Sequence, residues 1–229
     1  MSSSSHLKRP QIDLRLPSGL LLRDAAQMLT AKFRLWPWAV YDGVPLANPH
    51  VVSDTDFDVS FQLGARTNIS RAEYRRRIGA VGERLSEFLR DIPCDASLDD
   101  PSLDLASLRR AVIDICGCMT KLDGIKLANA SKIIHRHRPA FLPILDSVVR
   151  DYYWFAISLR DEELYLRLSS MTWGEYSFVL MEKIRQDLLA ISGQLAEVRR
   201  AVAGADYAGV SALRILESLI WYYYVGRSP

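Results

Sequence analysis

A cluster of basic residues surrounds a short turn in the middle of the chain. Between Thr120 and Arg138 there are five basic residues and one acidic residue, a local charge of +4, whereas the whole chain carries +2. Phosphate groups are bound by such cations and by the free backbone N–H groups at a helix N-terminus. We therefore predict a phosphate-binding edge made of Gly124, Ile125, Lys126, Lys132, Arg136 and Arg138. An ordinary helical hairpin with a solvated basic face is the alternative.

Asp146, which precedes a segment of helical apolar periodicity, is the candidate catalytic residue that a family resemblance of residues 122–147 implies. A carboxylate placed beneath a sugar ring can stabilise positive charge that develops there, and it can orient or deprotonate a water molecule. An aspartate at this position also suits the N-cap of a helix. The two interpretations are compatible, and the sequence leaves both open.

Aromatic residues at two places could stack on a nucleobase. Trp36, Trp38 and Tyr41 lie in a segment that contains three prolines and is predicted to be a loop, and Tyr152 follows Asp146. We predict a base pocket from these four residues. Packing in the core is the alternative for each of them, because aromatic side chains dominate cores.

Metal and cofactor sites are not expected. His135 and His137 are two residues apart, so on a helix their side chains diverge and do not form a two-ligand face. The three cysteines, Cys94, Cys116 and Cys118, match neither a structural zinc site nor an iron–sulfur cluster. Three cysteines are few, and their number is odd, so they do not suit a disulfide framework. This indicates a reducing compartment.

The elements that would position these residues all follow a helical period. No alternating strand pattern bounded by turn residues is found, so an all-α fold is predicted. Residues 1–17 are predicted to be a disordered tail and 18–229 a single helical domain, with a possible seam at 93–103 and a helical hairpin over 105–137. The expected helices cover 19–34, 55–65, 71–91, 105–119, 127–137, a segment from 146, 172–202 and 211–224.

Composition excludes several classes of protein. With 49% hydrophobic and 24% charged residues and a net charge of +2, the 229-residue chain is neither a polycation nor an acidic disordered protein. The longest apolar run, Leu219 to Val225, is too short to span a membrane. No apolar signal-peptide core follows the N-terminus, so a cytoplasmic location without membrane contact is expected.

The segment from Leu122 to Ala130, Leu-Asp-Gly-Ile-Lys-Leu-Ala-Asn-Ala, resembles the helix-hairpin-helix of the DNA glycosylases related to endonuclease III. Those enzymes place a catalytic aspartate at the start of a later helix, and Asp146 stands at the family's spacing after Ala128, which occupies the position of the family's lysine. The stretch from Ser131 to Ser147 is also similar to an uncharacterised bacterial family of the same fold. The resemblance covers about a fifth of the chain and implies a glycosylase-like helical fold.

Three residues of this segment differ from the family's pattern, and they change the reaction that the resemblance implies. Because Ala128 replaces the lysine nucleophile, a Schiff-base mechanism is not implied. Lys126 replaces the second glycine and Asp123 the proline of the hairpin. The resemblance implies monofunctional, aspartate-assisted hydrolysis of an N-glycosidic bond in a nucleic acid or nucleotide, with no cofactor. A helix-hairpin-helix protein that binds nucleic acid or a protein partner without chemistry is the alternative.

Overall fold

The prediction of an all-α protein is confirmed. A computed structural model describes residues 11–35, 41–63, 70–122, 125–202 and 209–226, and within these ranges the chain forms eleven helices and one two-stranded ribbon. The elements are β1 (Leu14–Arg15), β2 (Leu21–Leu22), α1 (Ala25–Leu35), α2 (Asp54–Gln62), α3 (Arg71–Gly79), α4 (Gly82–Arg90), α5 (Arg109–Thr120), α6 (Leu127–His135), α7 (Ser147–Arg160), α8 (Glu162–Leu168), α9 (Trp173–Ala190), α10 (Ser192–Val202) and α11 (Ala212–Val225).

The N-terminal ribbon corrects the prediction of a disordered tail over residues 1–17. Residues 1–10 lie outside the described part of the chain, but β1 pairs antiparallel with β2, with Leu14 opposite Leu22. Ile12, Leu14 and Leu16 alternate along the segment and are all buried, the pattern of a strand with one face on the core. A tight turn at Gly19, whose φ is +105°, connects the two strands. The first helix therefore begins at Ala25 and not at the expected residue 19.

Two of the expected helices are divided in the structure, and one further helix is present. The long helix expected over 71–91 is divided into α3 and α4, with glycines at Gly79 and Gly82 flanking the break. The helix expected over 172–202 is divided at Ile191 into α9 and α10. Helix α8 was not predicted, and it begins at Asp161, whose side chain accepts a hydrogen bond from the Leu164 N–H.

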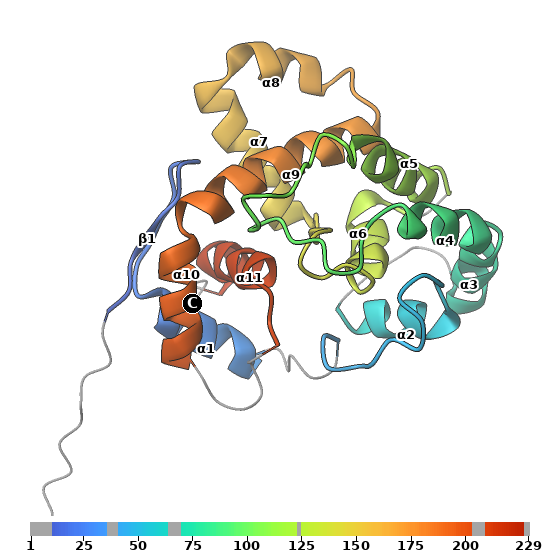
Figure 1. Cartoon of the computed structure of the whole chain (residues 1–229), viewed down its shortest axis with the longest axis horizontal. Helices are drawn as coiled ribbons and strands as arrows, with labels where there is room; N and C mark the ends of the chain where they lie inside the picture. The colour runs from blue at the N-terminus through green and yellow to red at the C-terminus, as the bar shows by residue number, and fades with distance from the viewer. Residues whose placement is uncertain (1–10, 36–40, 64–69, 123–124, 203–208, 227–229) are drawn as a thin grey trace, which may run out of the picture.

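Helix α6 lies near the centre of the molecule (Figure 1), with α2, α3 and α4 on one side and α1, α10 and α11 on the other. Helix α5 packs along α9, and α1 packs against α10 and α11. One hydrophobic cluster includes residues from Ile12 in the ribbon to Ile220 in α11. Helix α11 also packs against α7. The candidate site lies where residues of α1, α6, α7 and α11 line one cavity.

The connection from α4 to α5, which includes the segment 93–103 expected as a possible seam, packs onto the helices around it. Leu98 is fully buried, and its N–H donates to the carbonyl of Ala140 at 2.9 Å. Arg185 of α9 donates to the carbonyls of Leu98 and Leu103. The helices on both sides of this connection therefore contribute to the same hydrophobic cluster.

Candidate functional site

Asp146 caps a helix and also faces a cavity. Its Oδ1 accepts a hydrogen bond of 3.0 Å from the N–H of Val149, which fixes the first turn of α7. The half-buried side chain also lines a cavity of about 540 Å³. The prediction that Asp146 stands at a helix start is confirmed, and the cap leaves the carboxylate at the wall of a space large enough for a small organic ligand.

Four helices that are far apart in the sequence form the walls of this cavity. Helix α1 contributes Lys32, α6 contributes residues of its first two turns, and α7 contributes residues of its first turn. Helix α11 closes the opposite side with Arg214, Glu217, Ser218 and Trp221. The remaining lining residues are Leu63, Lys126, Ala128, Asn129, Lys132, Ile144, Asp146, Ser147, Val148, Val149 and Arg150.

The polar face of α11 was missed in the sequence, although a signal for it is present. Arg214, Glu217, Ser218 and Trp221 follow the i, i+3, i+4, i+7 spacing of one helical face. The residues between them are apolar and buried, so this polar stripe interrupts an otherwise hydrophobic helix. Glu217 and Trp221 of this stripe line the cavity.

Glu217 is a buried carboxyl group at the cavity wall. Its Oε1 accepts a hydrogen bond of 2.6 Å from the Ile144 N–H, and its Oε2 lies 3.6 Å from Nη1 of Arg214. Burial raises the pKa of Glu217 to about 8, against the attraction of the Arg214 charge, and the nearby Asp146 carboxylate adds to the increase. Glu217 therefore retains its proton at neutral pH.

Two lysines face the cavity from different helices. Nζ of Lys32 lies 3.6 Å from the centroid of the Trp221 ring, and Nζ of Lys132 donates to the carbonyl of Leu63 at 2.9 Å. Burial lowers the pKa of Lys32 to about 8 and also lowers that of Lys132. The negative charge of Asp146 raises the pKa of both lysines and so opposes the effect of burial. The Asp146 carboxylate is therefore close enough to interact with both ammonium groups.

The predicted phosphate-binding residues of the hairpin differ in their exposure to the cavity. Lys126 is exposed at the N-cap of α6 and lines the cavity, and its φ of −86° shows that this position imposes no left-handed conformation. Ile125 is buried and its N–H donates to the Leu122 carbonyl, so the prediction that Ile125 binds phosphate is wrong. Gly124 lies outside the described residues.

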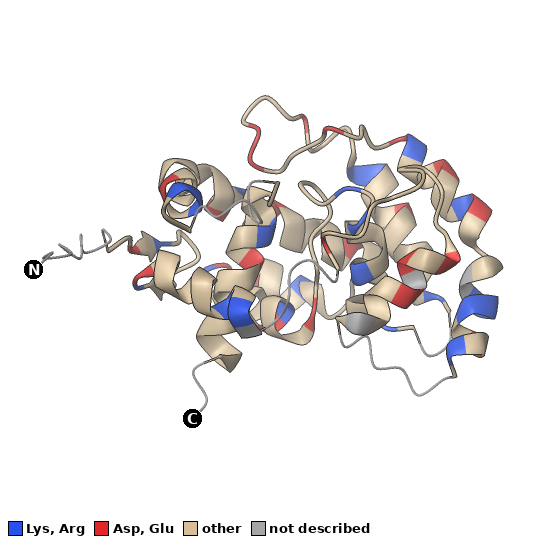
Figure 2. Cartoon of the chain, turned by 90° about the horizontal axis from the view of Figure 1, so that it is seen from below, with Lys and Arg blue, Asp and Glu red and all other residues tan. Residues whose placement is uncertain are grey.

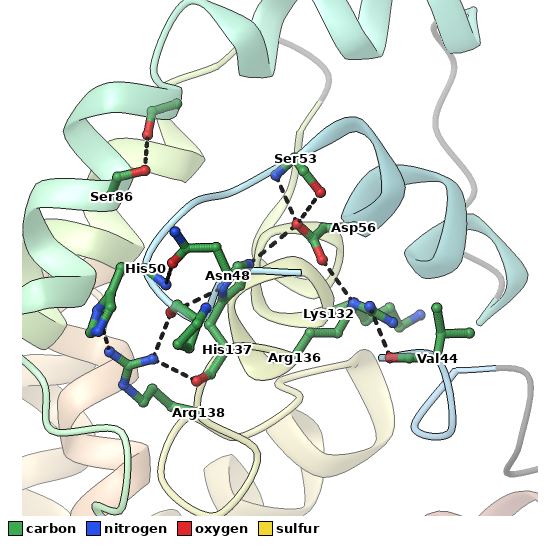
Figure 3. A network of polar contacts seen from close by, with 12 residues as sticks. Val44, Asn48, His50, Ser53, Asp56, Ser86, Lys132, Arg136, His137 and Arg138 are labelled. Carbon is green, nitrogen blue, oxygen red and sulfur yellow. Dashed lines mark hydrogen bonds and ion pairs between the residues drawn. The ribbon is translucent and has the colours of Figure 1, made fainter. Parts of the chain in front are cut away.

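The structure also corrects the assignment of Arg136 and Arg138 to phosphate binding, because both guanidinium groups are buried and bonded within the protein (Figure 3). Arg136 donates to Oδ1 of Asp56 at 2.9 Å and to the carbonyls of Tyr41 and Val44. Arg138 donates to the carbonyls of Leu89, Ile92, Pro49 and His137. These two arginines fasten the end of α6 to neighbouring segments.

The predicted base pocket does not form from the described aromatic residues. Tyr41 is 2% exposed, its hydroxyl donates to the Lys132 carbonyl, and it does not line this cavity. Tyr152 is buried and hydrogen-bonded to Ser18. Trp36 and Trp38 lie outside the described residues. The cavity contains Trp221 of α11 instead.

Charged residues of both signs are interspersed over the helices (Figure 2), without one continuous basic face in this view. The local surplus of +4 is therefore largely turned inward: Lys132 faces the cavity, and Arg136 and Arg138 are bonded in the interior. This arrangement differs from the exposed basic track that binds a nucleic-acid backbone.

In the part of the chain that the structure describes, no group of three or more His, Cys, Asp and Glu residues is arranged to hold a metal ion. No helix in those same ranges has both the length and the apolar character needed to cross a membrane.

The fold and cavity therefore define an all-α protein with a polar internal site. Residues 25–224 match the family described as "Family of unknown function (DUF6308)", and the chain belongs to this family. The matched region runs from the start of α1 almost to the end of α11, so it includes every residue that lines the cavity. No curated protein and no solved structure matched the chain.

Proposed function

We propose that this protein hydrolyses an N-glycosidic bond of a substrate that enters the cavity between α1, α6, α7 and α11. The observation that carries the proposal is the pair Asp146 and Glu217: two carboxyl groups in one cavity, of which Glu217 is kept protonated by burial. Pairs of acidic groups whose environments separate their protonation states are typical of acid–base hydrolysis of glycosidic bonds.

The proposed reaction divides the chemistry between these two residues. As the bond from the sugar C1′ to the base nitrogen breaks, its electron pair leaves with the base, and Glu217 donates a proton to the departing base. The Asp146 carboxylate stabilises the positive charge that develops on the sugar. Water then adds to C1′, and Asp146 accepts the proton that the water loses. The products are a free base and a sugar with a hydroxyl group at C1′.

Two features of the chain support hydrolysis in a glycosylase-like helical fold. Helices α5 and α6 are consecutive and packed against each other, and Asp146 caps the next helix, as the resemblance to the glycosylases implies. Ala128, at the position of that family's lysine nucleophile, lines the cavity beside Asp146. Because alanine has no nucleophilic group, water is the nucleophile in the proposed reaction.

A second candidate function is binding without chemistry, and one observation favours it. The Asp146 carboxylate already accepts the Val149 N–H, which is a sufficient structural reason for an aspartate at this position. In that case the cavity would hold a ligand that the protein does not change. Measurement of base release separates the two functions.

The test compares Asp146→Asn with the wild-type protein on a panel of nucleosides and nucleotides, with free base quantified by chromatography. Asparagine caps a helix about as well as aspartate, so the variant should fold normally while it loses the charge. We expect the rate of base release to fall by about 100-fold or more. Asp95→Asn, at an exposed position outside the cavity, is the matched control and should retain full activity.

Full activity in Asp146→Asn would remove Asp146 from the reaction. If the wild-type protein releases no base from any compound but binds members of the panel, the binding function replaces hydrolysis. Reduction with borohydride provides a further check, because covalent trapping of substrate would show a lysine nucleophile and contradict direct attack by water.

A further inference from the structure

Helix α6 presents a polar face to the cavity next to Asp146. Asn129 and Lys132 are three residues apart, so they lie one above the other on that face, and Lys32 of α1 lies close enough for the charge of Lys132 to lower its pKa. The side chains of these three residues carry eight hydrogen-bond donors when both lysines are charged, and Lys132 uses one of them on the Leu63 carbonyl. They form a cluster of donors that is separate from the two carboxyl groups.

Besides Oε2 of Glu217, two polar side chains that line this cavity make no hydrogen bond to the described residues. Asn129 is 6% exposed, and its side-chain amide is turned to the cavity wall without such a bond. Ser218 is 1% exposed, and its Oγ also lacks a partner. Because an unsatisfied buried polar group costs free energy, native proteins rarely retain one without a ligand or water to bond with it. The two groups indicate a polar ligand.

The charges of the cavity determine the sign of this ligand. Among the residues that the structure describes, five basic side chains line the space, and the two acidic ones are Asp146 and Glu217. Asp42 and Asp151 pair with Arg214 and Arg150 from outside the cavity, and the basic groups remain in excess when these are counted. Since burial keeps Glu217 protonated, the excess of positive charge at neutral pH is larger still.

We infer that the cavity contains a subsite for a phosphate monoester, held by Lys132 and Lys32 with Asn129 and Ser218 as neutral donors. A phosphate monoester is a dianion near neutral pH with three acceptor oxygens, which matches two ammonium groups, an amide and a hydroxyl. The phosphate subsite does not depend on the proposed function, but the identity of the rest of the ligand does. If the protein hydrolyses an N-glycosidic bond, the substrate is a nucleoside monophosphate.

The location of the positive charges favours a small phosphate monoester over a nucleic-acid strand. A strand requires a row of exposed cations along its backbone, whereas Arg136 and Arg138 are buried and bonded to protein groups. The cavity of about 540 Å³ lies in the range of small-molecule sites. A phosphodiester also carries a single charge, which satisfies only one of the two lysines.

The test measures binding to the full-length chain by calorimetry. The probes are inorganic phosphate, four nucleoside 5′-monophosphates, the four matching nucleosides and a short single-stranded oligonucleotide. We expect phosphate to bind and at least one monophosphate to bind about tenfold or more tightly than its nucleoside. Lys132→Met and Asn129→Ala should each remove most of that difference. Lys121→Met, at an exposed position outside the cavity, is the matched control and should retain it.

A second measurement uses only the wild-type protein, so it does not depend on the folding of a variant. Lys32 is partly deprotonated at pH 8, because its pKa is about 8. A bound dianion stabilises the charged ammonium, so phosphate binding at pH 8 should take up protons. Titrations in two buffers of different ionisation enthalpy reveal this uptake as a difference in apparent heat.

The outcomes separate this inference from the proposed reaction. Phosphate binding without release of any base contradicts the hydrolase but supports the subsite, and Asp146→Asn should still bind phosphate. Equal affinity for nucleosides and their monophosphates, or tighter binding of the oligonucleotide than of any monophosphate, would overturn the subsite.

Discussion

Oδ1 of Asp56 accepts a hydrogen bond of 2.9 Å from Nε of Arg136, and both side chains are buried. Nε2 of His137 lies 3.4 Å from the other carboxylate oxygen, Oδ2, which also accepts hydrogen bonds from Ser53 at the start of α2. Asp56 therefore joins the N-terminus of α2 to the end of α6. This contact explains why part of the basic cluster is unavailable to a ligand.

Loss of the Asp56 carboxylate should strongly destabilise the protein. Asp56→Asn leaves the Arg136 charge buried without its acidic partner, and breaking such a pair costs about 3–5 kcal/mol. Asp58 on the same helix pairs with Arg71 and Arg75 near the surface, where an ion pair contributes about 0–1 kcal/mol. Asp58→Asn is therefore the control. Urea unfolding measures both variants, and equal losses would contradict the structural role of Asp56.

Arg138 should be required for stability rather than for binding. The side chain is fully buried and donates to the carbonyls of Ile92 and Pro49, among others. Lysine cannot reproduce the planar fork of five donors, so Arg138→Lys leaves buried carbonyls unsatisfied. We expect a loss of about 2–4 kcal/mol in the free energy of unfolding, and less than about 0.5 kcal/mol for Arg90→Lys at an exposed position. A stable Arg138→Lys protein with weakened ligand binding would restore the original assignment.

Glu217 should make stability fall with rising pH. Its pKa in the folded protein is about 8, above the ordinary value of 4.5, so between these values the folded state retains a proton that the unfolded state has lost. The free energy of unfolding therefore decreases with pH in this window, with a slope of up to about 1.4 kcal/mol per pH unit from this group. Glu217→Gln should remove this contribution.

The measurement for Glu217 is urea unfolding of wild-type and variant proteins between pH 5 and pH 8. The stability of Glu217→Gln relative to the wild type should increase steadily with pH across this range. Glu163→Gln, at an exposed position of α8, should show no such trend. A pH-independent difference between the wild type and Glu217→Gln would show that the carboxyl group is not held protonated.

Two glycines in packed helices should respond in opposite directions to alanine. A Cβ on Gly174 in α9 would lie 2.3 Å from the Ile113 carbonyl oxygen of α5, so Gly174→Ala forces the two helices apart at a cost of about 1–3 kcal/mol. A Cβ on Gly117 in α5 meets nothing within 4 Å, and Gly117→Ala should gain up to about 1 kcal/mol. Thermal unfolding distinguishes the two, and a neutral Gly174→Ala would disprove the close contact of α5 with α9.

The sequence by itself determined the fold class and most helix positions. The apolar periodicity around Val112 and Val149 and the capping residues Asp146 and Ser211 located α5, α7 and α11 to within a few residues, because periodicity and caps are local properties. The division of 71–91 and the ribbon at Leu14 were missed, since short elements stabilised by distant partners leave a weak local signal.

Only the tertiary structure decided which charges can reach a ligand. Lys132 and Arg136 stand one helical turn apart and look equivalent in the sequence, yet one faces a cavity and the other is bonded to Asp56. Lys32 and Glu217 come from opposite ends of the chain and meet at the same cavity. Residue type and local spacing state what a side chain can do, whereas burial and partners depend on which distant helix packs against it.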